Sequence, residues 1–559
     1  MLTHIRRSTL LLTTLTAAMV ASTLLQAAPA EVRGTWLTTT GPDHIRSGFN
    51  TESVTGDLRS IGLNTVYVES WKNGYTNFPS PTLATLTGGP DRSTFLGSNR
   101  DLMQETLINA HRNQMNVSAW FEYGFAAQFV GSGGTPSNPL ATHMRNQGWL
   151  LQDQTGQFAN GSNGFAWMNP AVPEVRQFLI DITLEAVERY DLDGIQFDDR
   201  LAWPREFGWD PTTAGLYHAD TGNLLPLNVN DTAFSNWRQQ QVSEFAAELS
   251  AAVRSARPDL QLSVSPSIAG FSEPNFNADW TTWVDDDLFD EFVPQVYRSS
   301  IGSFNSTIDS QVAPFEPNDL DELIVGIRIN GSGAATPAAD VLQMINRTRQ
   351  EGAAGHSLWY SSGVRDLYDD ELESFYDVAG EGHADNPNFP TDHRPAPLVA
   401  SSVGANDWNV NVTEAGRYRV IGRQGGIWKE LTVAALDAGT HQLAAANVTQ
   451  LELLVDRRSS TVLLGDFGDD GNIAGNDFLK WQTAKSLVNP ESSLGDANLD
   501  GLVDSLDLER WQLNYGWSSS PLAQQTFLVP EPGSIGLFVL GFLAASIRSR
   551  SGNLGRGLR

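Results

Sequence analysis

Two adjacent carboxylates, Asp198 and Asp199, follow directly on a short, mostly apolar run, Gly194-Ile195-Gln196-Phe197. Apolar residues recur at helical spacing over residues 173–190, so this part of the chain predicts a helix that leads into a buried parallel strand. In an α/β barrel, the residues just past the carboxyl end of a strand line the active site. Acidic side chains at that place suit acid–base or nucleophilic chemistry, so we expect an enzyme.

Seven further apolar runs predict the strands that position these carboxylates. The eight predicted strands are Arg33–Leu37, Thr65–Glu69, Asn116–Trp120, Gly194–Phe197, Leu260–Ser265, Glu291–Gln295, Leu323–Ile329 and Gly355–Trp359. Helical patterns separate most of them, which predicts an α/β fold in the form of a TIM-type (β/α)8 barrel over residues 31–380. A doubly wound open sheet is the alternative. It is disfavoured because no Gly-rich phosphate loop follows the first run.

Composition and the N-terminus restrict the surroundings in which the protein works. The chain of 559 residues carries a net charge of −29, which argues against nucleic acid or an anionic membrane surface as a partner. It contains no cysteine, which excludes disulfides and thiol chemistry. Arg6 and Arg7, an apolar stretch and small residues near Ala30 predict an export signal over residues 1–30. We therefore expect a secreted protein of the cell envelope or the extracellular surface.

The segments after the barrel change in character. Residues 381–397 are rich in Pro, Asn and Asp and predict a linker. Short alternating runs over residues 398–460 predict a small β-sandwich accessory domain, in which we find no chemistry.

Residues 465–517 hold an acidic loop twice, with the spacing of a calcium site. Such loops place oxygen ligands at positions 1, 3, 5, 7 and 12, with Gly at position 6. The second copy fits throughout, whereas Gly468 occupies position 3 of the first. The predicted ligands are Asp466, Asp470, Asn472 and Asp477 in the first loop, and Asp496, Asn498, Asp500, Leu502 and Asp507 in the second. Asn472 and Leu502 would bind through their carbonyl groups.

Two C-terminal segments resemble known modules. The acidic loops end on Asp and lead into Trp-bearing helices, and they resemble a dockerin type I module. This resemblance implies structural Ca²⁺ and a cohesin-like or surface partner. Residues 529–559 hold Val529-Pro530-Glu531-Pro532, an apolar run and then arginines, and they resemble the PEP-CTERM sorting signal. That resemblance implies transient membrane association during delivery, and an ordinary C-terminal anchor is the alternative.

Motifs distributed over residues 31–360 resemble the bacterial "glycosyl hydrolase-like 10" family. In chain order they are Arg33-Gly34-Thr35-Trp36, Asn64-Thr65-Val66-Tyr67, Ala119-Trp120-Phe121, Asn169-Pro170-Ala171, Asp193-Gly194-Ile195-Gln196-Phe197-Asp198-Asp199, Ser265-Pro266 and Pro294-Gln295-Val296-Tyr297. The resemblance implies a TIM-type barrel that cleaves a polysaccharide or peptidoglycan glycan without a catalytic cofactor. Relatives often carry an aromatic residue after the paired aspartates, where this chain has Arg200.

Glycoside hydrolysis assigns roles to the acids. It needs one carboxyl group that protonates the leaving oxygen and a second that acts as nucleophile or base. Asp198 is the first acid at the mouth of the fourth strand, and we expect it to be the nucleophile or base. Glu122, at the mouth of the third strand, is the expected proton donor, and Glu69, which ends the second strand, is its rival. Asp199 either takes part directly or orients Arg200 and binds sugar hydroxyls.

Other polar and aromatic residues at the expected mouth are candidate sugar contacts. They are Glu69, Trp120, Asn169, Arg200, Gln295, Tyr297 and Trp359. Amide and hydroxyl groups can bond sugar hydroxyls, and aromatic faces can stack on the ring, although a buried Trp can equally belong to the core. Asp193 precedes its strand, so we expect a structural role for it.

A secreted glycoside hydrolase is therefore the leading hypothesis. The alternative is a non-catalytic carbohydrate-binding or cell-surface scaffold protein, in which the barrel has lost activity and the dockerin-like module dominates. A lyase or a deacetylase is not favoured, because the nine histidines form no metal-binding pattern.

Overall fold

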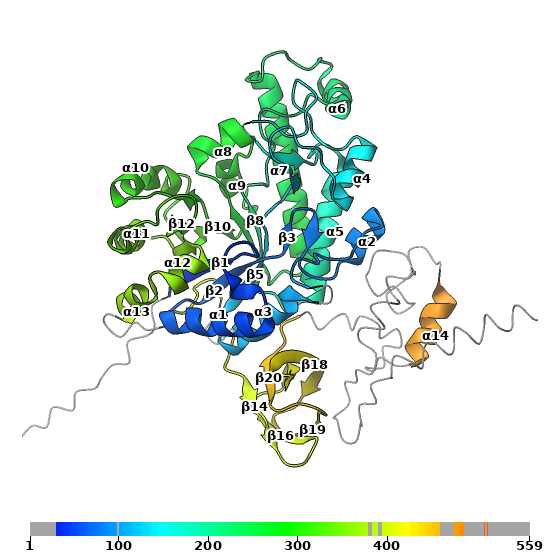
Figure 1. Cartoon of the computed structure of the whole chain (residues 1–559), viewed down its shortest axis with the longest axis vertical. Coiled ribbons are helices and arrows are strands. Elements are labelled where there is room, and N and C mark those ends of the chain that lie inside the picture. The colour runs from blue at the N-terminus through cyan, green and yellow to red at the C-terminus, as the bar shows by residue number, and fades with distance from the viewer. Residues whose placement is uncertain are drawn as a thin grey trace, which may run out of the picture.

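A parallel β-sheet that curls on itself forms the centre of the protein (Figure 1). The computed structural model describes residues 30–97, 100–161, 163–377, 383–389, 394–458 and 475–485, with Val503, Leu508 and Trp511. The strands of the central sheet are β1 (Val32–Leu37), β2 (Thr65–Glu69), β5 (Asn116–Phe121), β8 (Gly194–Asp198), β9 (Gln261–Ser265), β10 (Glu291–Phe292), β11 (Gln295–Val296), β12 (Ile324–Arg328) and β13 (Gly355–Trp359). All eight predicted strands are confirmed within one residue at each end, and the sixth is divided into β10 and β11.

The order of the strands shows that the sheet is curled. It runs β10-β9-β8-β5-β2-β1-β13-β12-β11, with every pairing parallel. The end strands β10 and β11 are two halves of one strand interrupted at Pro294, which has no N–H to give to a ladder. Isolated bridges join Phe292 to Leu323 and Ser267 to Gln295. The two ends of the sheet therefore meet, as in a TIM-like barrel.

Helices surround this sheet and follow its strands. They are α1 (Gly48–Ile61), α2 (Pro81–Thr87), α3 (Leu102–Arg112), α4 (Pro139–Gln147), α5 (Pro173–Arg189), α6 (Pro211–Thr221), α7 (Thr232–Ala256), α8 (Ala269–Phe276), α9 (Trp280–Asp285), α10 (Ile301–Val312), α11 (Ala338–Glu351), α12 (Ser361–Asp366) and α13 (Asp369–Asp377), with short 3-10 turns at Asp43–Ile45 and Leu320–Glu322. Two small antiparallel sheets, β3 (Trp71–Lys72) with β4 (Tyr75–Thr76) and β6 (Ala126–Phe129) with β7 (Phe165–Trp167), lie in the segments that follow β2 and β5. Within the described residues, no helix is both long and apolar enough to cross a membrane.

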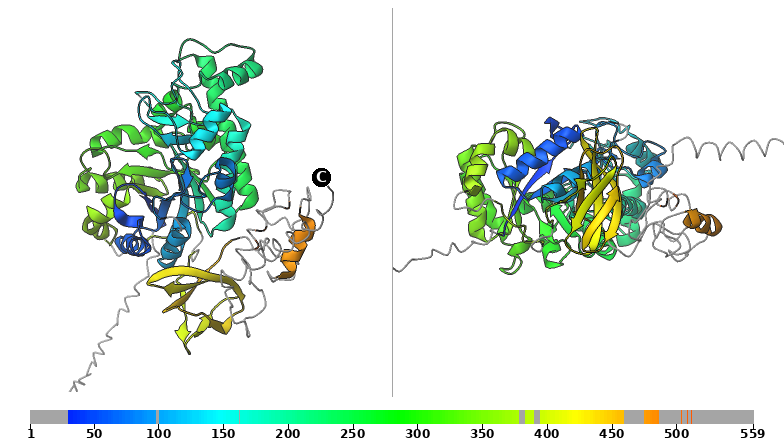
Figure 2. Two further views of the ribbon diagram at one scale, coloured as in Figure 1. Left: turned by 45° about the vertical axis from the view of Figure 1, so that its right-hand side comes forward. Right: turned by 90° about the horizontal axis from the view of Figure 1, so that it is seen from below.

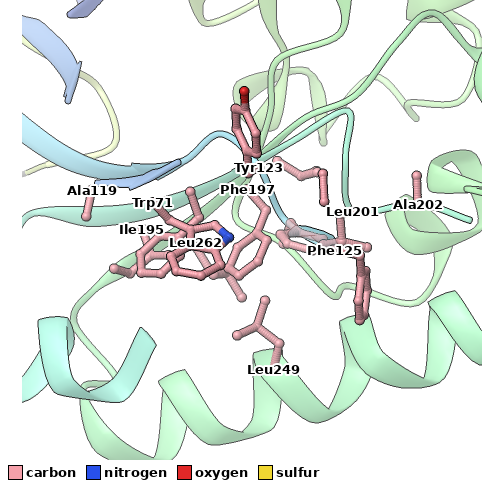
Figure 3. Close-up of a cluster of buried hydrophobic side chains, with 14 of the residues drawn as sticks. Trp71, Ala119, Tyr123, Phe125, Ile195, Phe197, Leu201, Ala202, Leu249 and Leu262 are labelled. Carbon is pink, nitrogen blue, oxygen red and sulfur yellow. The ribbon is translucent and has the colours of Figure 1, made fainter. Parts of the chain in front are cut away.

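The core between the sheet and its helices fixes which side chains of β8 face the barrel interior. Side chains alternate along a strand, so Ile195 and Phe197 point to the helices while Gln196 and Asp198 point inward. Ile195 and Phe197 are fully buried (Figure 3). The Phe197 ring lies 6.1 Å from that of Phe245 in α7. Gln196 instead accepts a hydrogen bond from Trp36 Nε1 at 2.7 Å. This packing sets the register that brings Asp198 to the mouth.

Two antiparallel sheets follow the barrel. One contains β14 (Leu398–Val399), β20 (Leu451–Val455), β17 (Gly416–Gln424) and β18 (Ile427–Leu436), and the other contains β15 (Ser401–Ser402), β16 (Asp407–Val412) and β19 (Gly439–Ala444). They share one apolar cluster, and they lie beside α1 and α3 (Figures 1 and 2). Arg112 of α3 stacks on Trp428 at 3.9 Å and pairs with Glu452 at 2.7 Å. The predicted strands of this segment are present, and its status as a separate accessory domain stays a prediction.

Several sequence predictions lie outside the described residues. These are nearly all of the export signal, the sorting signal at 529–559, part of the linker, and every predicted calcium ligand except Asp477. Asp477 is buried in α14 (Gly475–Ala484). Among the residues that the structure describes, no cluster of three or more His, Asp or Glu side chains could hold a metal ion. The calcium, partner and localisation assignments stay predictions.

Candidate active site

Asp198 occupies the mouth of the barrel at the end of β8, with its carboxyl group held by three N–H donors. Trp120 Nε1 donates to Oδ2 at 3.1 Å, and Gln295 Nε2 donates to Oδ1 at 2.6 Å. The backbone N–H of Asp199 also donates to Oδ1, at 2.7 Å. The structure thus brings together residues from β5, β8 and β11 that the sequence predicted for the site, and these donors fix the orientation of the carboxyl group.

Arg200 lies among three carboxylates without a short contact to any of them. Its Nη1 is 3.4 Å from Asp199 Oδ1, and 3.8 Å from both Asp198 Oδ2 and Glu122 Oε1. Its hydrogen bond goes to the backbone carbonyl of Glu122, at 3.2 Å. Asp198 and Glu122, which follow different strands, are therefore brought to the same guanidinium nitrogen.

The backbone explains why Glu122 comes so close to Arg200. Phe125 N–H donates to the Arg200 carbonyl at 3.0 Å, so the segment after β5 lies against the segment after β8. Gly124 has a φ of 42°, and a Cβ there would stand 2.4 Å from the Arg200 carbonyl oxygen. Glycine is required at this position both for the positive φ and for the close approach.

Glu122 is joined to Glu69 through Lys72. Lys72 Nζ lies 2.9 Å from Glu122 Oε2 and 2.8 Å from Glu69 Oε2. Glu69 is completely buried and also accepts hydrogen bonds from the hydroxyls of Thr38 and Thr39 and from Thr39 N–H. The Glu122 side chain retains 13% exposure. Of the two rival acids, only Glu122 thus combines partial access with few fixed partners.

The charged groups of the site shift one another's pKa values. Burial, and then the neighbouring carboxylate of Asp199, raise the pKa of Asp198 well above its usual range, although Arg200 opposes this. Burial and Glu69 likewise raise the pKa of Glu122, against the opposing effects of Lys72 and Arg200. Burial would lower the pKa of Lys72, but Glu122 and Glu69 outweigh it and raise that pKa, so Lys72 stays charged. Carboxyl groups with raised pKa values are suited to proton transfer near neutral pH.

Aromatic rings line the barrel interior beside Asp198. Tyr297 and Trp359 are partly exposed and lie 5.8 Å apart, centroid to centroid. The Trp359 ring also lies 5.8 Å from Trp120 and 5.7 Å from Trp36. Trp120 and Trp36 are each 1% exposed, so they support the site from below, whereas Tyr297 and Trp359 present surface on which a sugar ring could stack.

One predicted contact is not brought to the mouth. Asn169 is fully buried; its Nδ2 donates to Thr213 Oγ1 at 3.0 Å, and its Oδ1 accepts from Ala171 N–H at 2.9 Å. These bonds hold the turn before α5 and leave the amide no surface for a sugar. Sequence reasoning also missed Lys72, Thr38 and Thr39. The signal that could have found them is their position just past β1 and β2.

A barrel that presents two partly buried carboxyl groups at the carboxyl ends of its strands has the arrangement of a glycoside hydrolase. The profile of the family "Glycosyl hydrolase-like 10" matches residues 31–342, which is more than half of the chain. The chain therefore belongs to the glycosyl hydrolase-like 10 family.

Named relatives extend this result. "Glycosyl hydrolase DigH" of Escherichia coli (strain K12) is 25% identical over 279 residues, which cover 43% of this chain and 56% of DigH. "Glycosyl hydrolase YngK" of Bacillus subtilis (strain 168) is 22% identical over 286 residues, covering 47% of this chain and 51% of YngK. The chain spans about half the length of the curated relatives it matches. Among solved structures, the PgaB (BpsB) glycoside hydrolase domain from Bordetella bronchiseptica is similar over 62% of this chain and 99% of that domain, with a TM-score of 0.47 and 15% identity.

Proposed function

We propose that this protein is exported and hydrolyses O-glycosidic bonds of a polysaccharide or peptidoglycan glycan by paired-carboxylate catalysis. The observation that carries the proposal is the pair formed by Asp198 and Glu122, each 3.8 Å from the same nitrogen of Arg200. Family membership and the export signal in the sequence support it as well.

In the proposed reaction, Glu122 is the acid. It gives its proton to the leaving glycosidic oxygen while the bond between that oxygen and the anomeric carbon breaks. Burial favours the protonated form before the reaction, and the nearby Lys72 and Arg200 stabilise the carboxylate that results. The surroundings of Glu122 thus favour its protonated form before the transfer and stabilise its carboxylate after it.

Asp198 is the second carboxyl group. Its carboxylate either attacks the anomeric carbon, forming an ester that water then cleaves, or removes a proton from an attacking water. Either step needs the ionised form of Asp198, which Arg200 and the Asp199 N–H favour against the effect of burial. The N–H donors from Trp120 and Gln295 hold the carboxylate in place. The two routes give opposite anomers, so the first product seen by NMR identifies the route.

Hydrolysis of a defined glycan panel tests this proposal. We would incubate the full chain with peptidoglycan glycan strands, glycol chitin, xylan and carboxymethylcellulose and measure new reducing ends. The Asp198→Asn variant, with the same circular dichroism spectrum, is the matched control. We expect release by the wild type on at least one glycan and at least ~10²-fold less by the variant. Equal release by both proteins would contradict the proposed role of Asp198, and no release on any glycan would contradict the proposed activity.

A further inference from the structure

Five aromatic rings form a continuous row on the carboxyl-end face of the barrel, which we call the aromatic ridge. Its members, in spatial order, are Phe129, Phe165, Trp167, Phe276 and Phe271. Successive ring centroids are 5.0, 6.1, 6.3 and 5.5 Å apart. Each step is a ring contact, so the five rings form one packed series whose middle member, Trp167, is buried.

The ridge is built from two segments that are held together. Its first three rings come from the paired strands β6 and β7, which follow β5, and its last two from α8, which follows β9. α8 lies on the side of the barrel away from the two antiparallel sheets (Figure 1). The segment after β8 is bonded to both. Phe125, next to β6, donates its backbone N–H to the Arg200 carbonyl at 3.0 Å, whereas the backbone N–H of Trp203 donates to the Phe276 carbonyl and Asn277 Nδ2 to the Trp203 carbonyl, each at 2.7 Å. The two segments that carry the rings are therefore held by the same stretch of backbone.

The second ring of the ridge, Phe165, lies next to the reaction centre. The Arg200 guanidinium lies 4.7 Å from the centre of the Phe165 ring, and a nitrogen of the same guanidinium is 3.8 Å from both Asp198 and Glu122. A ligand that reaches from the two carboxyl groups past Arg200 would thus meet Phe165 and then Phe129.

The two end rings are left open to solvent. Phe129 is 56% exposed and Phe271 is 46% exposed, whereas the central Trp167 is 1% exposed. Gly164 makes room for the outer ring, since a Cβ there would stand 2.8 Å from the Phe129 ring. What distinguishes Phe129 from an isolated exposed Phe is its contact with Phe165, whose ring lies under Arg200 of the polar site.

We infer that the aromatic ridge binds a stretch of glycan chain beyond the sugars at the cleaved bond. The inference rests on the proposed function, because it takes the occupant of the mouth to be a glycan. Phe rings have no polar group, so they would bind the apolar C–H faces of sugar rings by stacking. Phe129 and Phe271 stand at the two ends of the series of ring contacts, so the ligand that we infer to reach both is an oligosaccharide or a longer chain.

Affinity electrophoresis tests the ridge. The full chain carrying Asp198→Asn would be run in native gels that contain each of the four glycans named above, so that binding is measured without cleavage. Phe129→Ala and Phe271→Ala would be added singly in the same background. The matched control is Phe49→Ala, which removes a Phe that is 55% exposed on α1 and lies against the β17–β18 turn. Unchanged melting temperatures would show that all variants are folded.

We expect at least one glycan to retard the protein, with a dissociation constant about two- to tenfold weaker for each ridge variant and unchanged for Phe49→Ala. Retardation that is equal in all variants, or absent with every glycan, would overturn the inference. Wild-type hydrolysis of the same panel separates the two proposals. Cleavage that persists with equal binding by the ridge variants would leave the proposed function standing without the ridge. Binding that is weakened in the ridge variants, without any cleavage by the wild type, would contradict the proposed hydrolysis and leave the binding role of the ridge standing.

Discussion

The two ends of β8 each carry a pair of aspartates, and the two pairs lie in opposite electrostatic surroundings. The amino-end pair, Asp191 and Asp193, precedes the strand, whereas the mouth pair, Asp198 and Asp199, stands at its carboxyl end. Asp191, Asp193 and Asp198 are all buried. One strand of five residues therefore separates two acidic sites of the same side-chain chemistry, so their differences arise from their neighbours.

The main difference between the two pairs is the distance from each pair to its arginine. Arg394 donates to Asp193 at 2.7 Å and to Asp191 at 2.8 Å, which satisfies the amino-end pair with charge-assisted hydrogen bonds. His111 Nε2 lies 3.0 Å from Asp193 and adds a further partner. At the mouth, Arg200 stays at 3.4 Å or more from both aspartates, so their oxygens keep room for a substrate.

The pKa values of Asp191 and Asp198 are shifted in opposite directions as a result. Burial alone would raise the pKa of Asp191, but Arg394, His111 and Arg419 outweigh it and hold that pKa well below its usual range. The pKa of Asp198 moves the other way, because burial and Asp199 outweigh Arg200. The distance to the neighbouring cations thus separates Asp191, whose pKa is lowered, from Asp198, whose raised pKa fits the reactive role that we propose for it.

The largest effect expected at the amino end is on stability. Asp193→Asn leaves Arg394 and His111 short of their charged partner in a buried site, so we expect a loss of about 3–5 kcal/mol in the free energy of unfolding. Urea denaturation followed by tryptophan fluorescence would measure it. Asp259→Asn is the control, because Asp259 pairs with Arg257 while its side chain is 56% exposed. A loss no larger than that of the control would show that the buried pair does not stabilise the fold.

His111 should make the same end sensitive to acid. Burial, and then Arg394, lower the pKa of His111 to about 4 in the folded protein, from an ordinary value of 6.5. The unfolded chain therefore binds the proton first, and stability should fall by about 3 kcal/mol as the pH drops from about 6.5 to about 4. In His111→Gln this part of the pH dependence should disappear, whereas His441→Gln, at a half-buried site in β19, should retain it. An identical pH dependence in His111→Gln and the wild type would refute the assignment.

At the mouth, Glu122→Gln should impair catalysis without unfolding the protein. We expect a loss of about 10²-fold or more on natural glycans, where the leaving oxygen needs a proton, and a smaller loss on activated aryl glycosides. The matched control is Glu69→Gln, at the rival acid. If the rates on both kinds of substrate fall equally in Glu122→Gln, the proton donor is another group.

The smallest effect concerns Lys72 as a positioning residue. Its cation lowers the pKa of Glu122, so Lys72→Met should raise that pKa further and reduce activity at neutral pH by about tenfold. The alkaline limb of the pH–rate profile, which reports loss of the Glu122 proton, should move to higher pH. Lys72→Arg should restore the limb. A change in rate without any movement of the limb would indicate a purely structural role.

The sequence predicted the barrel better than the site because the two depend on different physical signals. Apolar runs such as Gly355–Trp359 are local, and each strand must bury both faces, so its position can be read from the chain. The mouth residues Asp198, Trp120 and Gln295 were found because they directly end or belong to such strands. Lys72 was missed because it lies on a two-residue strand, β3, in a loop whose path depends on tertiary contacts.

Asn169 differs from Lys72, because the sequence predicted it as a sugar contact and the structure buries it. A polar residue before a Pro-rich helix start could equally face a ligand or close a turn, and only its burial and its bonds to Thr213 and Ala171 distinguish the two. The split of the sixth strand at Pro294 had a local signal, since proline cannot donate to the ladder.

The most direct test of the contrast between the two ends of β8 is the turnover of Asp198→Asn and Asp193→Asn, per folded molecule and on one glycan that the wild type cleaves. We expect Asp198→Asn to lose at least ~10²-fold in turnover, with a smaller loss in the free energy of unfolding than Asp193→Asn. We expect Asp193→Asn to keep wild-type turnover while losing stability. Turnover of Asp198→Asn within a few-fold of wild type, or an equal loss of turnover in both variants, would contradict the contrast between the two ends.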